Sequence, residues 1–210
     1  MKKVKYLLGI GILILACVIG FLSLSKKQIK ESANAYIRMY MNPESHVPKQ
    51  LSYTEKEYAS ILKKMEDIQS KQFETYFKDS GLPITKTQLH DIYEAYQSAL
   101  KSLDYHLSIK RNGSGKATIS IRCRQIDLEK LEDTATKHSL AIIEEQKITT
   151  LKEAAQIFVS ELTTGLENHT PKGEEKTIQI SWTKKDGSWK PEDIDTFIQE
   201  MHDLTITKLE

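Results

Sequence analysis

Four basic residues are spaced so that a β-hairpin would gather them on one face. His106 and Lys110 alternate with apolar residues in one segment, and Arg122 and Arg124 do so in the next. Side chains two residues apart on a strand share a face, so all four would lie on the polar face of the hairpin. Such a face could bind an acidic partner through ion pairs. The alternative interpretation is an exposed surface that keeps the sheet soluble.

The sequence contains no recognisable catalytic or metal-binding motif. The GxSxG, HExxH, GxGxxG and Walker A patterns are absent, and the two cysteines do not form a CxxC pair. No two of the six histidines have the helical spacing of metal ligands; they are His46, His90, His106, His138, His169 and His202. We therefore expect a non-catalytic protein without a metal site or cofactor. The sequence leaves open whether a catalytic pair is assembled from distant segments.

A second candidate is the pair of tryptophans near the C-terminus, Trp182 and Trp189, with lysines between them. Aromatic rings interleaved with lysines could form a platform for a sugar or a nucleic acid. A two-residue turn at Asp186 and Gly187 would instead pair Lys184 with Trp189. Trp182 would then lie diagonal to Trp189 on the apolar face of a hairpin. The pattern thus predicts core packing, with Trp182 buried against the last helix.

The N-terminus has the features of a membrane-targeting segment. Three lysines precede the run from Tyr6 to Ser25, which has 20 residues and no charge. As a helix this run would span about 30 Å, the thickness of a bilayer core. We expect residues 1–25 to be a signal peptide or a transmembrane anchor. We expect the body to lie on the extracellular side, because a short basic tail normally stays in the cytoplasm.

Two kinds of anchor are compatible with this segment. The stretch ILAC, from Ile14 to Cys17, resembles a bacterial lipobox, in which Cys17 would carry the lipid. The residues after Cys17 stay apolar as far as Ser25, which favours an uncleaved transmembrane helix. Both alternatives tether the body to a membrane.

Composition limits the other partners. The 210 residues carry a net charge of +1, so there is no electrostatic footprint for nucleic acid. Without Lys2, Lys3 and Lys5, 27 basic residues remain against 29 acidic ones, a net charge of −2. A disulfide between Cys17 and Cys123 is not expected, because Cys17 lies in the apolar segment. We expect Cys123 to be a buried packing thiol.

The elements that would position these residues follow from periodicity. Helical patterns occupy residues 28–41 and the segments after the N-cap residues Thr54, Thr85, Asp127 and Thr150, and a last helix is predicted to start at Pro191. Period-two patterns predict two hairpins, at 105–124 and 177–190. In the first, a loop of Asn112, Gly113 and Ser114 would pair Arg111 with Gly115 and Ile109 with Ala117.

This order predicts an α+β fold in which an N-terminal membrane helix is followed by helices and two β-hairpins. The hairpins are expected to join one antiparallel sheet covered by helices. Three parts are expected: residues 1–25 as the anchor, 26–84 as a helical segment, and 85–210 as an α+β domain with two helix–hairpin–helix units.

Two resemblances add to this interpretation. ILAC at Ile14–Cys17 and DGSWK at Asp186–Lys190, with a helical first half, resemble small surface lipoproteins of Gram-positive bacteria, several of unknown function. Some of these are similar to the NTF2/cystatin-like class, in which a sheet wraps a helix. The chain also resembles the VirB8-type component of secretion and conjugation machines. That family has an N-terminal membrane helix and an NTF2-like domain, but its strands are consecutive.

Three functions are compatible with these observations. The first is a membrane-tethered, extracytoplasmic, non-catalytic domain that binds a protein or an envelope ligand. The second is a VirB8-like scaffold subunit of a secretion or conjugation complex. The third is an enzyme acting on the cell envelope, which a pocket with convergent titratable groups would favour.

Overall fold

The computed structural model describes residues 26–169, 171 and 174–207. The predictions for residues 1–25, including those for Cys17, lie outside the described residues. The elements are an N-terminal helix at residues 26–41, then α2 (Glu55–Ser80), α3 (Lys86–Lys101), β1 (Tyr105–Arg111), β2 (Lys116–Arg124), α4 (Leu128–Gln146), α5 (Leu151–Glu167), β3 (Glu175–Lys185), β4 (Ser188–Pro191) and α6 (Ile194–Thr205). The predicted α+β class is confirmed.

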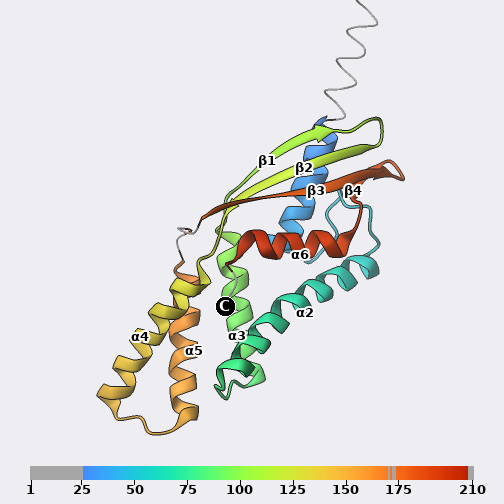
Figure 1. The fold of residues 1–210 in the computed structure, drawn as a ribbon. Helices are drawn as coiled ribbons and strands as arrows, with labels where there is room; N and C mark the ends of the chain where they lie inside the picture. The colour runs from blue at the N-terminus through green and yellow to red at the C-terminus, as the bar shows by residue number, and fades with distance from the viewer. Residues whose placement is uncertain (1–25, 170, 172–173, 208–210) are drawn as a thin grey trace, which may run out of the picture.

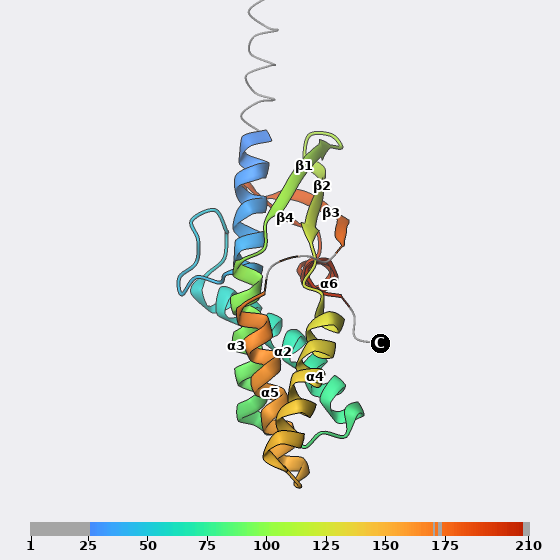
Figure 2. The ribbon, with the colours of Figure 1, turned by 90° about the vertical axis from the view of Figure 1, so that its left-hand side faces the viewer.

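The two hairpins form one antiparallel sheet in the order β1-β2-β3-β4. The N-terminal helix and α6 lie against one side of this sheet (Figures 1 and 2). The α4–α5 hairpin extends away from the sheet, at the end of the molecule opposite the start of the N-terminal helix (Figure 1). α4 packs on α5, and α5 packs on α3. One hydrophobic cluster contains residues from both the 26–84 segment and the rest of the chain.

Polar side chains begin the helices where the sequence predicts. Thr54 and Thr85 each form a complete capping box, with Glu57 and Gln88 respectively. The start of the last helix differs from the prediction. Pro191 ends strand β4, which lies at the edge of the sheet, where a residue without an N–H is tolerated. α6 starts three residues later, because the Asp193 carboxylate accepts a hydrogen bond from the N–H group of Thr196.

The predicted register of the first hairpin is wrong by two residues. The structure pairs Arg111 with Ala117 rather than with Gly115. Ile109 accordingly pairs with Ile119 rather than with Ala117. Because the error is an even number of residues, the apolar side chains of both strands still share one face.

Asn112 explains the difference in register. Its N–H donates to the carbonyl of Lys116 (2.9 Å), so the strand pairing extends one residue further. Its side-chain Nδ2 donates to Thr118 Oγ1 (2.7 Å). The loop is therefore Gly113 to Gly115, and Gly113 has a φ of 122°, a conformation that favours glycine.

The second hairpin has the predicted turn. Asp186 and Gly187 both have positive φ angles, 53° and 82°, as a two-residue turn between right-twisted strands requires. Lys184 consequently pairs with Trp189, as predicted. The Asp186–Gly187 turn therefore fixes which residues of β3 and β4 face the core.

Both tryptophans are buried, which confirms the core interpretation. Trp182 has no exposed surface and Trp189 is 2% exposed. The Trp182 ring meets Tyr36 of the N-terminal helix edge to face, with centroids 5.2 Å apart, and meets Phe197 of α6 at 6.4 Å. Edge-to-face pairs of this kind stabilise beyond their buried area. The ligand-platform interpretation of the tryptophans is thus wrong.

We expect the substitution Trp182→Ala to lower the free energy of unfolding by about 3–5 kcal/mol, because it removes a fully buried ring that contacts two helices. Chemical denaturation followed by circular dichroism measures this change. Lys184→Ala, at the exposed turn of the same strand, is the control and should change stability by less than about 0.5 kcal/mol. Equal effects of the two substitutions would contradict the packing role of Trp182.

Candidate functional site

The four predicted basic residues do share the outer face of the sheet. His106 of β1 lies directly opposite Arg122 of β2. Lys110 and Arg124 are on the same face, towards the two ends of the hairpin, and all four side chains are exposed. The inner face of both strands packs against the core instead.

An acidic residue that sequence reasoning did not include lies beside two of them. Glu175 begins β3 and pairs with Arg124 in the sheet. Its carboxylate is 3.7 Å from a guanidinium nitrogen of Arg122 and 3.9 Å from one of Arg124. These ion pairs are solvent-exposed, so they contribute little to stability and an anionic ligand can compete with them.

The join between β2 and β3 extends the basic face beyond the first hairpin. Lys116 pairs with Thr183 across this join, and Thr183 pairs with Lys190 of β4. Three basic residues therefore enlarge the face, namely Lys116, Lys185 and Lys190. The sequence places Lys185 on the polar side of its strand, but the pairing of the two hairpins is a tertiary feature.

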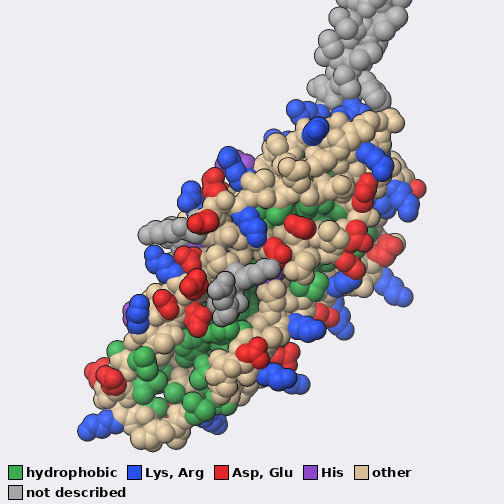
Figure 3. Space-filling view, in the orientation of Figure 1, with side chains coloured by type: hydrophobic (Ala, Val, Ile, Leu, Met, Phe, Trp, Pro, Cys, Tyr) green, Lys and Arg blue, Asp and Glu red, His purple; other side chains and the backbone are tan. Residues whose placement is uncertain are grey.

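The complete outer face is cationic with a hydroxyl-rich centre. Its strand residues include six lysines and arginines, Lys110, Lys116, Arg122, Arg124, Lys185 and Lys190, together with His106. Glu175 is the one acidic residue among the strand residues on this face. Between the charges lie Ser108, Thr118, Ser120, Thr177, Gln179, Ser181 and Thr183. Figure 3 shows lysine and arginine side chains, with acidic ones among them, over the part of the surface where the sheet lies.

Cys123 lies on the opposite, inner face of the sheet. Its side chain is 2% exposed, as predicted for a packing thiol. Burial raises the pKa of the Cys123 thiol to about 11, and the nearby carboxylates of Asp104 and Glu175 act in the same direction. A thiol in this environment is a poor nucleophile at neutral pH.

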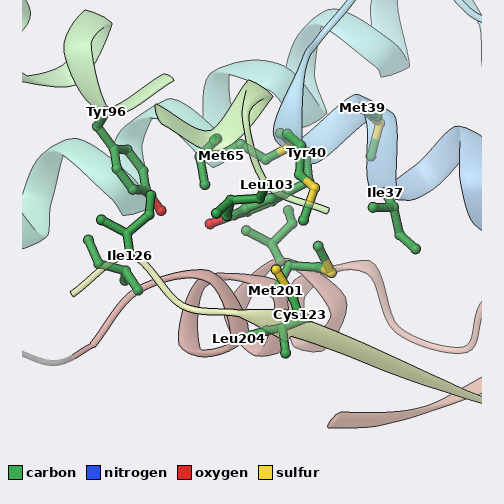
Figure 4. Close-up of a cluster of buried hydrophobic side chains, with 14 of the residues drawn as sticks. Ile37, Met39, Tyr40, Met65, Tyr96, Leu103, Cys123, Ile126, Met201 and Leu204 are labelled. Atoms are coloured by element: carbon green, nitrogen blue, oxygen red, sulfur yellow. The ribbon is translucent and has the colours of Figure 1, made fainter. Parts of the chain in front are cut away.

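A buried polar network occupies the centre of the helical core, and sequence reasoning missed it. The Tyr40 hydroxyl lies 3.4 Å from Nδ1 of His202, and the Tyr96 hydroxyl lies 3.3 Å from the Thr205 hydroxyl. The hydroxyl groups of Tyr40 and Tyr96 point toward one another (Figure 4). In the sequence, each of these residues fits the apolar stripe or the polar face of its own helix. No sequence pattern therefore indicates that they contact one another. The network joins three helices and has a structural use.

Two adjoining cavities beside the N-terminal helix were also not predicted. Their volumes are about 210 and 330 Å³. Arg38 and Glu44 line both cavities. Glu44 belongs to the loop that follows the N-terminal helix, and no local sequence pattern shows that this loop folds back along the helix.

Some classes of site find no support in the described residues. Across 26–169, 171 and 174–207, no group of three or more His, Cys, Asp or Glu side chains could hold a metal ion. Within the same part of the chain, no helix has the length and apolar character needed to cross a membrane.

Comparison with known proteins places the chain in a family. The family described as Domain of unknown function (DUF5105) matches residues 25–205, and the chain belongs to this family. No curated protein matches the sequence.

A solved structure has a similar fold. It is the crystal structure of YcdA from Bacillus subtilis, described as a putative lipoprotein, with a TM-score of 0.68 and 16% sequence identity. The match covers 89% of this chain and 59% of the YcdA chain. At this identity the likeness concerns the fold.

We expect Cys123 to resist alkylation in the folded protein. In a Cys17→Ser background Cys123 is the remaining thiol, and its raised pKa keeps it protonated at about pH 9, where an ordinary thiol is largely ionised. Iodoacetamide labelling followed by mass spectrometry should show slow modification of native protein and rapid modification after denaturation. Rapid labelling of the native protein would contradict the buried, protonated state.

Proposed function

We propose that the chain is a membrane-tethered, extracytoplasmic and non-catalytic domain that binds an anionic ligand of the cell envelope through the outer face of its sheet. The observation that supports this proposal is the charge of that face: its strand residues include six lysines and arginines and one histidine against one glutamate, and Glu192, just after β4, pairs with Lys116 (3.5 Å). These groups belong to strands fixed by their pairing, so they form a preorganised surface. The hydroxyl groups between them can donate hydrogen bonds to phosphate or carboxylate oxygens.

The filled inner face supports an outer binding surface. Ile119, Ile121, Ile180 and Trp182 are buried against the helices. A ligand therefore has no space between the sheet and α6. We propose that the fold is NTF2/cystatin-like, with the sheet wrapped around the N-terminal helix, but with the inner face used for packing.

We expect the triple substitution Lys110→Gln, Arg122→Gln and Lys190→Gln to weaken the binding of soluble polyphosphate by about tenfold or more. Three exposed ion pairs of roughly 0.5–1 kcal/mol each would be lost. Isothermal titration calorimetry measures the affinity, and neutral dextran should give no binding. Added salt should weaken the binding of polyphosphate, because exposed charges are screened.

The matched control removes the same charge from elsewhere. Lys63→Gln, Lys71→Gln and Lys137→Gln change exposed residues of α2 and α4. This control should bind polyphosphate as the unmodified chain does. An equal loss in both triple variants would mean that binding follows net charge and would overturn the assignment to the sheet.

We also propose that Cys17 carries a lipid. Two observations support this anchor over an uncleaved helix: the lipobox-like ILAC stretch and the description of YcdA as a lipoprotein. We expect a fatty-acid label supplied to growing cells to be incorporated into the chain and lost in Cys17→Ser. A membrane-bound chain without label, and with residues 1–16 retained in its mass, would show the uncleaved helix instead.

A second candidate function is a VirB8-like scaffold subunit, and an apolar surface favours it. Leu140 of α4 is 55% exposed and Leu151 of α5 is 58% exposed. Figure 3 shows apolar side chains gathered over the α4–α5 hairpin. Cross-linking in intact cells distinguishes the two roles: several cross-linked membrane proteins would support the scaffold, and their absence would sink it.

A further inference from the structure

The two cavities beside the N-terminal helix share their walls. One face of this helix carries Glu31, Asn34 and Arg38, which are three or four residues apart and therefore line up along the helix. The opposite face of the helix packs in the core through Ala33, Tyr36 and other apolar residues. The face with Glu31 is thus turned outward, and the loop at residues 42–50 rises beside it (Figure 2).

Two tyrosine hydroxyl groups hold the walls in place. The Tyr58 hydroxyl, from α2, donates to the carbonyl oxygen of Glu44 (3.2 Å), which fixes the loop. The Tyr105 hydroxyl, from β1, donates to Oδ1 of Asn34 (3.1 Å), which fixes the other side. A site whose walls are fixed before binding loses less entropy when a ligand enters.

The lining of the two cavities is mainly polar and includes a few buried apolar side chains. The buried lining residues include Ala35, Met39, Met41, Leu100 and Leu103. A mainly polar lining with a few apolar contacts suits a small charged ligand rather than an apolar one.

The charges differ between the two cavities. The smaller cavity has the carboxylates of Glu31 and Glu44 with Arg38. The larger one has the cations Arg38 and Lys101 with Glu44. A purely anionic ligand would meet Glu44 in either cavity, and a purely cationic one would meet Arg38. Like charges at close range disfavour both ligands.

We propose that the two cavities form one binding site for a short zwitterionic peptide. Its ammonium group would lie in the smaller cavity, near the carboxylates of Glu31 and Glu44. Its carboxylate would lie in the larger cavity, near Arg38 and Lys101. Its small apolar side chains would lie beside Met39, one of the buried lining residues. This site is separate from the outer face of the sheet and does not depend on it.

Tri-alanine tests the site, measured by isothermal titration calorimetry on the full chain in detergent micelles. We expect saturable binding in the micromolar-to-millimolar range. N-acetyl-tri-alanine amide, which lacks both charges, should bind about tenfold more weakly or worse. Arg38→Gln and Glu44→Gln should each reduce the affinity for tri-alanine by a similar factor. Circular dichroism and thermal unfolding of each variant show whether it remains folded.

Two sets of controls separate this site from other effects. Lys71→Gln and Glu74→Gln make the same charge changes on the exposed surface of α2 and should leave the affinity for tri-alanine unchanged. The triple variant of the sheet face should also bind tri-alanine normally. The proposal is overturned by a lack of saturable binding at millimolar tri-alanine or by equal binding of the uncharged peptide. It is also overturned if Arg38→Gln and Glu44→Gln, both folded, retain full affinity.

Discussion

The packing of Trp182 between two helices holds the sheet to the helical part of the molecule. Its ring meets Tyr36 of the N-terminal helix and Phe197 of α6, and these two rings also meet each other, with centroids 5.7 Å apart. Three segments that are far apart in the sequence are thereby joined at one point. The register of β3 depends on this contact, because a shift of one residue would move the ring to solvent.

This packing decides where ligands can bind. The inner face of the sheet is filled, so both proposed binding surfaces lie elsewhere, on its outer face and beside the N-terminal helix. The outer face offers fixed cations and hydroxyl groups on a nearly continuous surface, which suits an extended anionic ligand. The cavities at Arg38 and Glu44 are open to solvent and carry both signs of charge, which suits a small zwitterion. The two proposed sites differ in ligand because their geometry and charge differ.

Capping residues and hydrophobic periodicity predicted most helices and strands correctly. The predictions that were wrong have physical causes. Thr54 and Thr85 identified helix starts because a capping hydroxyl acts on the next three residues. Pro191 was assigned to the first turn of α6, yet it pairs with Trp182 in β4, since the sheet edge accepts a residue without an N–H. The first hairpin was misaligned because the side chain of Asn112 reaches Thr118, a contact that strand periodicity does not reveal. The alternation around His106 and Arg122 was sufficient to place both on one face, because a hairpin is a local structure. Their role in binding stays a prediction.

The sequence by itself determined the helices, the two hairpins, and the polar and apolar face of each strand. These features depend on neighbouring residues and on the periods of 2 and 3.6. The tertiary structure alone decided that β2 pairs with β3, which adds Lys116 and Lys190 to the basic face and brings Glu175 beside Arg122. It also decided that the loop containing Glu44 lies beside Arg38. Both arrangements join residues distant in the chain, and such contacts depend on packing that no local pattern encodes.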